Sequence, residues 1–107
     1  MDSMQGALFE ENKMKTITKD KATKFIDNGA IIVDMRSPVS FRDGHIQGAV
    51  NLPLKKFVNL LMATPDKKKA IIIYGVTTTD EDVTYGFKYS EQLGFTNVHV
   101  TDYTTLR

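Results

Sequence analysis

The stretch IIVDMRSPVSFRDGHIQGAVNLPL, residues 31–54, decides the fold of this chain. Its first residues are apolar and mostly β-branched, and with Ala30 they predict a buried strand over 30–33. Ser37-Pro38 then places a capping hydroxyl before a proline at the first helical position, which predicts a short helix to about Arg42. A weaker strand is expected over 49–52, where the pattern is short and stops at a proline.

The alternation of strands and helices continues on both sides of this stretch. Apolar runs predict two more buried strands and a candidate fifth one, over 70–74, 98–100 and 14–17. Apolar residues at helical spacing, or a glycine that marks a stop, predict helices over 18–28, 54–62 and about 80–93. Alternating strands and helices with short connections indicate an α/β protein: one small domain with a mainly parallel sheet of four to five strands, flanked by helices.

Length and charge exclude several classes of function. The 107 residues suffice for one domain, which we expect over 14–107 after a flexible N-terminal tail, 1–13. Lys and Arg number 14 and Asp and Glu 13, so charge gives no reason to expect nucleic acid or a membrane surface as partner. No apolar run approaches the ~20 residues of a membrane span. Since the amino end also lacks a secretion signal, we expect a cytoplasmic protein.

The composition also limits the chemistry. The chain contains no cysteine, which excludes disulfides, thiolate metal sites and a catalytic thiol. Its two histidines, His45 and His99, lie far apart without a matching carboxylate motif, so we predict no metal site. In a parallel sheet, ligands bind at the carboxyl ends of the strands, which directs attention to the loops 34–37, 43–48 and 75–82.

An ordered set of residues within 31–54 closely resembles the first half of a rhodanese-like domain. In that family a strand ends in Asp-x-Arg, a short helix follows, and then come Gly-His-Ile-x-Gly-Ala and Asn-x-Pro. The matching residues here are Asp34 and Arg36, then Gly44-His45-Ile46-Gln47-Gly48-Ala49, then Asn51 and Pro53. The family's later Gly-Phe-x-Asn-Val is matched at 94–98, so the resemblance covers roughly residues 15–102.

The resemblance implies a site without its reactive group. Sulfurtransferases of this family carry a cysteine directly after the strand that corresponds to 71–74, and this cysteine holds sulfur as a persulfide. By position, Gly75 stands in the cysteine's place, so we predict no catalytic residue. The expected vestigial active-site loop consists of Gly75, Val76, Thr77, Thr78, Thr79, Asp80, Glu81 and Asp82.

The resemblance also implies pocket neighbours, for which we favour structural roles. The Asp34 carboxylate, at a strand end, can accept amide hydrogen bonds and pair with Arg36. His45 belongs to a turn in which the family's histidine mainly hydrogen-bonds the backbone. We expect His99, in the last strand, to be a satisfied, partly buried or surface histidine and not a ligand.

Carboxylates crowd the start of the helix predicted after Gly75. A helix N-terminus supplies about half a positive charge, which Asp80, Glu81 and Asp82 would more than cancel. An incoming anion would therefore meet negative potential. We expect Asp80 or Thr79 to cap this helix and the other two acids to interact favourably with its dipole.

Together these residues predict a catalytically inactive rhodanese-like domain, without a cofactor, that acts as an interaction or regulatory module. The partner would be an unknown protein or a second copy of the chain, since the family's final helix is missing and an apolar patch would be left uncovered. Tyr85 and Tyr89 form a candidate partner surface, although packing at the sheet rim is favoured. Two enzymatic alternatives stay open: a sulfurtransferase-family enzyme with altered chemistry, and a carboxylate or metal-assisted hydrolase that uses 75–82. A further alternative, which involves no reaction, is the binding of a small anion by the amides of this loop.

Overall fold

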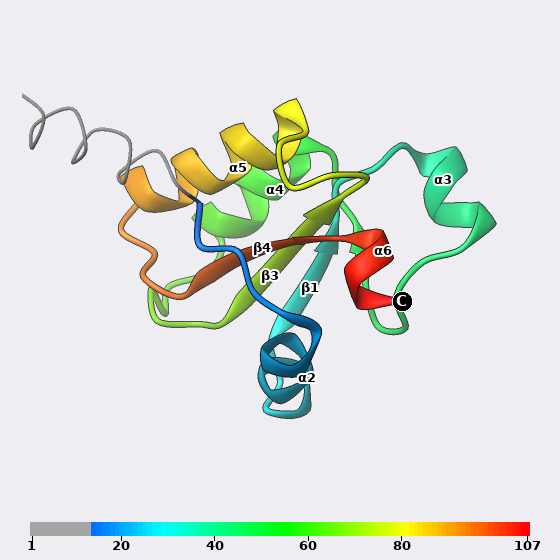
Figure 1. Ribbon diagram of the computed structural model, residues 1–107. Coiled ribbons are helices and arrows are strands. Elements are labelled where there is room, and N and C mark those ends of the chain that lie inside the picture. The colour runs from blue at the N-terminus through cyan, green and yellow to red at the C-terminus, as the bar shows by residue number, and fades with distance from the viewer. Residues whose placement is uncertain (1–13) are drawn as a thin grey trace, which may run out of the picture.

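The computed structural model describes residues 14–107, and the predicted tail over 1–13 lies outside the described residues. In chain order the elements are α2 (Lys19–Asp27), β1 (Ile31–Asp34), α3 (Pro38–Asp43), β2 (Val50–Asn51), α4 (Leu54–Met62), β3 (Ile71–Gly75), α5 (Glu81–Gln92), β4 (Val98–Asp102) and α6 (Tyr103–Leu106). The predicted alternation of strands and helices is therefore confirmed, as Figure 1 shows.

The sheet has four strands in the order β2-β1-β3-β4, and every neighbouring pair is parallel. The predicted α/β class and the mainly parallel sheet are confirmed. The candidate fifth strand over 14–17 is reduced to a single bridge between Thr16 and Val100. In a parallel sheet all carboxyl ends lie at one edge, so the residues after β1, β3 and β4 are brought near one another.

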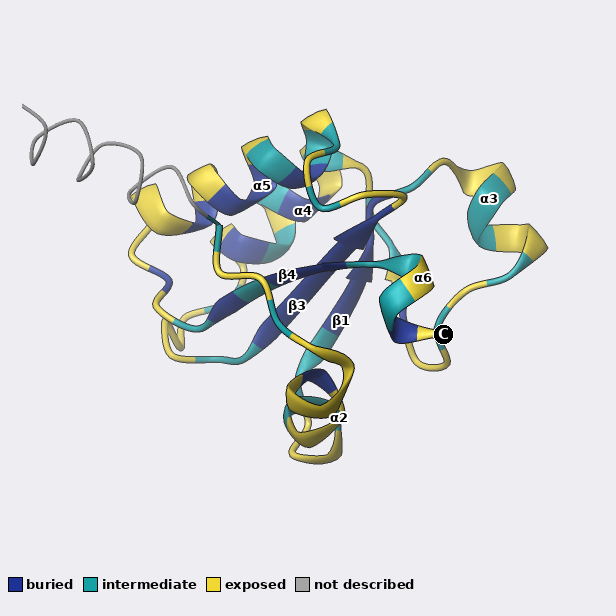
Figure 2. Ribbon diagram, in the orientation of Figure 1, coloured by how far each residue is buried: buried dark blue, intermediate teal, exposed yellow. Residues whose placement is uncertain are grey.

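Helices cover both faces of the sheet (Figure 1). Successive side chains of a strand point to opposite faces. Accordingly Ile71 and Ile73 of β3 pack in the cluster beneath α4 and α5, whereas Ile72 and Tyr74 pack in the cluster beneath α2 and α6. Figure 2 shows the result: the central strand is buried along its whole length, and the outer faces of the helices are exposed.

Hydroxyl side chains cap the starts of α2 and α3, and the cap of α3 is the one that the sequence predicted. The Thr18 hydroxyl accepts a hydrogen bond from the Lys21 amide at the start of α2, and the Ser37 hydroxyl accepts one from the Ser40 amide at the start of α3. Gly29, after α2, has a φ of 93°, which glycine adopts readily and other residues rarely do. The capping serine before α3 and the glycine after α2 therefore have the roles that the sequence predicted.

The carboxyl end differs from the expectation of a missing final helix. Residues Tyr103–Leu106 form the short helix α6, and the Asp102 carboxylate caps it by accepting a hydrogen bond from the Thr105 amide at 2.7 Å. Leu106 is only 8% exposed and packs in the same cluster as Ala22 of α2. Part of the apolar surface that we expected to be uncovered is therefore covered by the chain itself.

His99 of β4 is partly buried, which is one of the environments that we expected for it, but only one of its two ring nitrogens has a hydrogen-bond partner. Its Nε2 lies 2.7 Å from Asn97 Oδ1, and its ring stacks on Phe25 with centroids 4.5 Å apart. The other ring nitrogen, Nδ1, is buried and finds no hydrogen-bond partner among residues 14–107. Burial lowers the pKa of His99, and the charges of Lys15 and Lys21 lower it further.

This lowered pKa predicts a stability change in mild acid. As the pH falls, His99 of the unfolded chain binds a proton near pH 6.5, whereas His99 of the folded protein binds one only at a lower pH. The stability that neutral, buried His99 contributes is therefore fully present above about pH 6.5 and is lost as the pH falls from there through the folded pKa. Urea unfolding at pH 7.5 and pH 5 should show a smaller acid-induced loss of stability for His99→Phe than for the native protein. A matched His45→Phe variant should keep the native loss. Equal losses in all three proteins would contradict the assignment to His99.

Candidate functional site

The loop after β3 is built around Gly75, which ends the strand and is buried. A Cβ atom at this position would lie 2.5 Å from Asp80 Oδ2 and 2.8 Å from Val83 Cγ2. Val83 itself is fully buried in α5, so it has little room to move. Glycine is therefore required at position 75 by the close approach of these two side chains, since any side chain there would collide with both.

Asp80 supplies the group that fills this space. Its Oδ2 accepts a hydrogen bond from the Val76 amide, and its Oδ1 accepts one from the Thr77 hydroxyl, both at 2.7 Å. The expectation that Asp80 caps α5 is correct for its position but wrong for its side chain, which makes no capping hydrogen bond to the helix. The reason is that the loop offers two nearer donors, the Val76 amide and the Thr77 hydroxyl, and the Asp80 carboxylate points toward these and not toward the helix amides.

The threonines complete a loop that bonds to itself. Thr77 Oγ1 also accepts a hydrogen bond from the Thr79 amide at 3.3 Å and lies 3.3 Å from Thr79 Oγ1. Glu81 and Asp82 lie in the first turn of α5, where their charge interacts favourably with the helix dipole, as predicted. Val76, by contrast, is 61% exposed at the surface of the loop.

A second polar network is centred on Asp34 at the end of β1. Its side chain is completely buried, and Oδ1 accepts hydrogen bonds from the Arg36 amide at 2.8 Å and from Arg36 Nε at 3.1 Å. Oδ2 accepts from Arg36 Nη2 at 2.8 Å and from the Tyr74 hydroxyl at 2.7 Å. The predicted pairing of Asp34 with backbone and arginine is confirmed, and every bond in the network serves to satisfy a buried charge.

Arg36 links this network to the segments around it. Its Nη2 donates a hydrogen bond to the Gly44 carbonyl at 2.6 Å, and its guanidinium lies over the Tyr103 ring, 4.0 Å from the centroid. Hydrogen bonding to Asp34 raises the pKa of Arg36, and burial raises the pKa of the Tyr74 phenol. The arginine therefore remains a cation and the tyrosine a neutral donor over the physiological range.

Asn51 connects the end of β2 to the same network. Its side-chain amide donates to the carbonyls of Asp34 and Arg36, each at 2.9 Å. These bonds hold the backbone that carries both charged residues. The spacing from Asp34 to Asn51 that the sequence shows is thus explained by contacts within the fold.

His45 lies in a turn beyond α3 and is exposed. Its Nδ1 donates a hydrogen bond to the Phe41 carbonyl at 2.8 Å, and its ring stacks on Phe41 with centroids 3.7 Å apart. The prediction that His45 bonds the backbone of a turn is confirmed. Nothing in this geometry aims the imidazole at the loop after β3.

The predicted site residues thus fall into separate groups. Within the described residues, no hydrogen bond joins the loop 75–82 to Asp34, Arg36 or His45. Sequence reasoning assigned no role at the site to Tyr74, which is fully buried beside Asp34, or to Tyr103, which lies under Arg36. A usable signal was present for Tyr74, because a tyrosine in a buried strand requires a partner for its hydroxyl.

The model of the Rhodanese-like domain family matches residues 18–103 of this sequence. The chain belongs to the rhodanese-like domain family. The matched region runs from just before α2 to the first residue of α6, so it includes all four strands of the sheet.

Solved structures agree with this assignment. The rhodanese-like domain of the Anabaena protein Alr3790 has 27% identity and a TM-score of 0.58, over 69% of this chain and 83% of that one. A rhodanese from E. coli, solved with anions, has 24% identity and a TM-score of 0.62, over 72% and 91% of the two chains. The latter likeness shows the fold alone.

Two curated relatives match over shorter stretches. The Escherichia coli protein YibN is 45% identical over 42 residues, 38% of this chain and 29% of its own. The Escherichia coli thiosulfate sulfurtransferase PspE is 37% identical over 43 residues, 39% of this chain and 41% of its own. This rhodanese-like domain therefore matches less than half the length of these relatives.

The carboxylates of this rhodanese-like domain do not converge. Among residues 14–107, no group of three or more His, Asp or Glu side chains is placed to hold a metal ion. Asp80 is bound to its own loop, so the consecutive acids 80–82 do not share one centre.

Among the helices that the structure describes, none is long and apolar enough to cross a membrane.

Proposed function

We propose that this rhodanese-like domain is catalytically inactive and acts as an interaction or regulatory module. The observation that carries the proposal is the Asp80 carboxylate, which is packed against Gly75 and hydrogen-bonded to the Val76 amide. The resemblance assigns position 75 to the family's cysteine. A carboxylate thus stands where a thiolate or an anionic substrate would have to be accommodated.

The remaining groups of the loop offer no substitute for sulfur. Threonine is a poor nucleophile without an activating base, and its oxygen cannot hold sulfur as a persulfide. Thr77 donates its hydroxyl proton to Asp80, but that carboxylate is already shared with the Val76 amide. A second negative charge at the start of α5 would face Asp80, Glu81 and Asp82 together, so anion binding is opposed as well.

A sulfur-transfer assay tests the inactive site. We expect no thiosulfate-to-cyanide turnover from the pure protein at micromolar concentration, beside PspE as a positive control. Turnover that tracks the protein through purification would overturn the proposal and favour a family enzyme with altered chemistry.

A titration with magnesium or calcium, in which the melting temperature is measured at each metal concentration, tests the hydrolase alternative. A saturable shift of the melting temperature would support that alternative.

The interaction role needs its own test. The exposed side chains of Val76, Tyr85 and Tyr89 lie on or after the loop, where a protein partner could reach them. We expect a partner retained by the native domain to be lost when Asp80→Asn, Glu81→Gln and Asp82→Asn are combined. Identical capture by both proteins would remove the loop from the proposed interface.

We also propose that the protein is cytoplasmic, and cell fractionation tests this location.

A further inference from the structure

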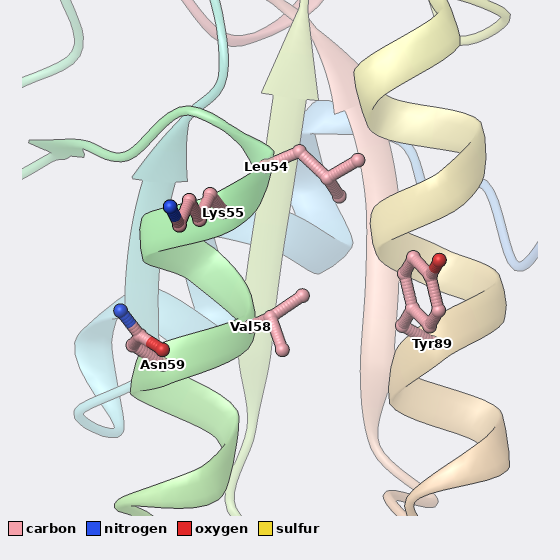
Figure 3. A pocket seen from close by; sticks show the side chains of 5 residues that line it. All are labelled: Leu54, Lys55, Val58, Asn59 and Tyr89. Carbon is pink, nitrogen blue, oxygen red and sulfur yellow. The ribbon is translucent and has the colours of Figure 1, made fainter.

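Two hollows on the surface of the described domain differ in the chemistry of their walls. The groove between α4 and α5 is lined by Leu54, Lys55, Val58, Asn59 and Tyr89, and in Figure 3 Leu54 and Val58 point from α4 toward α5. Its walls are largely apolar and carry a single charge, so they select no particular ligand.

The second hollow is polar and lies between α3 and α6, which follow the carboxyl ends of β1 and β4 (Figure 1). Its volume of about 310 Å³ is at the lower end for small-molecule sites. We call it the α3–α6 cleft, and it is lined by Arg36, Ser40, Asp43, Gly44, Tyr103 and Arg107.

Arg36 leaves one guanidinium nitrogen for a ligand in this cleft. Its side chain is only 7% exposed, and Nε and Nη2 make all of its side-chain hydrogen bonds within residues 14–107, to Asp34 and to the Gly44 carbonyl. Nη1 donates to none of the described residues and is not enclosed by them. Since each Nη of a guanidinium carries two N–H groups, two donors remain. The bonds to Asp34 and Gly44 hold these donors in a fixed direction.

Two hydroxyl groups of the cleft are also available to a ligand. The Tyr103 hydroxyl lies beside Gly44, where a Cβ atom would come within 3.0 Å of it, and it makes no hydrogen bond to the rest of the described chain. The Ser40 hydroxyl accepts a hydrogen bond from the Ser37 hydroxyl at 3.2 Å, which leaves its own proton for a ligand. Donors on three neighbouring side chains favour an acceptor with two oxygens, such as a carboxylate.

Arg107 adds a positive charge to the same wall. Its guanidinium lies 5.8 Å from the centroid of the Tyr103 ring, over which Arg36 also lies. Its backbone is fixed, because its amide donates to the Tyr103 carbonyl and its carbonyl accepts from Lys19 Nζ, both at 3.0 Å. Its side chain is exposed and forms no ion pair within residues 14–107. The charge of Arg36 is compensated by Asp34, whereas that of Arg107 is open to a ligand.

Asp43 makes the cleft unsuitable for a purely anionic ligand. It is the last residue of α3, and its exposed carboxylate forms no ion pair with any described residue. The two open charges that line the cleft, those of Arg107 and Asp43, are therefore of opposite sign. A phosphate would leave charge unpaired, whereas a zwitterion would pair a carboxylate with the arginine and an ammonium group with the aspartate.

We infer that the α3–α6 cleft binds a small zwitterionic amino acid, with its carboxylate on Arg36 Nη1 and Arg107 and its ammonium group on Asp43. The hydroxyls of Ser40 and Tyr103 donate to the same carboxylate. The expected dissociation constant is about millimolar, because ion pairs that stay exposed to water contribute little. Neither the cleft nor its test involves the loop 75–82 or a protein partner, so this inference and the proposed function can fail separately.

The test is a titration of the full-length protein followed by ¹H–¹⁵N NMR. The probes are glycine, β-alanine and γ-aminobutyrate, which differ in the distance between ammonium and carboxylate, and acetate and methylammonium each carry one of the two charges. We expect saturable shifts of the Arg36 Nε–H signal and of the Gly44 and Tyr103 amides with at least one zwitterion. Acetate and methylammonium should bind about tenfold more weakly, since each leaves one charge of the cleft unpaired.

Variants of the exposed charges assign the two ends of the ligand. Asp43→Asn should weaken binding of the zwitterion about tenfold without weakening that of acetate, whereas Arg107→Gln should weaken both. Glu91→Gln and Arg42→Gln make the same changes at exposed residues that do not line the cleft, and both should keep the native affinity.

Three results would overturn the inference. The first is the absence of saturable shifts at the cleft with every zwitterion, at concentrations far above millimolar. The second is acetate binding as tight as that of the best zwitterion, and the third is native affinity for that zwitterion in Asp43→Asn or Arg107→Gln.

Discussion

Gly75→Cys alone is expected to leave the protein without sulfur-transfer activity and to lower its free energy of unfolding by about 1–3 kcal/mol. The new Cβ would come within 2.5 Å of Asp80 Oδ2 and 2.8 Å of Val83 Cγ2, so the loop must shift to admit it. The thiolate, if formed, would face the Asp80 carboxylate, which disfavours a second negative charge. Thiosulfate-to-cyanide turnover and urea unfolding measure the two effects.

Two further variants separate shape from charge in this prediction. Gly75→Ala introduces the same Cβ without a thiol and should be destabilised by a similar amount. Combining Gly75→Cys with Asp80→Ala removes the nearest clashing group and should recover part of the lost stability. Efficient sulfur transfer by the single Gly75→Cys variant would contradict the account of the loop.

Asp34→Ala is expected to lower the free energy of unfolding by about 3–5 kcal/mol, the largest effect of any single substitution considered. Asp34 is fully buried, and the side chain of its partner Arg36 is only 7% exposed. Removing the carboxylate leaves a buried guanidinium and the Tyr74 hydroxyl without their acceptor. Denaturant unfolding monitored by circular dichroism gives the change directly.

The neighbours of Asp34 supply the controls. Tyr74→Phe removes one hydrogen bond to the same carboxylate and should cost about 1–3 kcal/mol, because a buried charged group loses a donor. Asp34→Leu/Arg36→Met replaces the ion pair with apolar groups and should lose less than Asp34→Ala, since no charge remains unpaired. An Asp34→Ala protein within 0.5 kcal/mol of the native one, roughly the range of ordinary surface substitutions, would refute the role assigned to this network.

Local signals in the sequence predicted most of the fold. The helix expected over 54–62 has those bounds in the structure because its apolar residues recur at helical spacing and a proline precedes it. The pairing of Asp34 with Arg36 was also predictable, since two residues at a strand end are neighbours in any fold. In each case the decisive contacts lie within a few residues along the chain.

The parts that were missed depend on contacts across the chain or between competing partners. Tyr74 joins Asp34 from 40 residues away, which the parallel pairing of β1 and β3 makes possible. The helix α6 was missed because Tyr-Thr-Thr-Leu has weak helix propensity, although Asp102 three residues before Thr105 is a capping signal. Asp80 was placed correctly at the start of α5, but the sequence could not decide between helix amides and the Val76 amide as its partner.

The central claim is that the Asp80 carboxylate occupies the place where a sulfur anion would have to form. The most direct measurement is the pH dependence of alkylation of the thiol introduced by Gly75→Cys, with and without Asp80→Ala. We predict that the single variant has a thiol pKa above the ordinary value of about 8.5, and that Asp80→Ala lowers it. A single variant whose thiol reacts with a pKa well below 8.5, as in an active sulfurtransferase site, would contradict the claim.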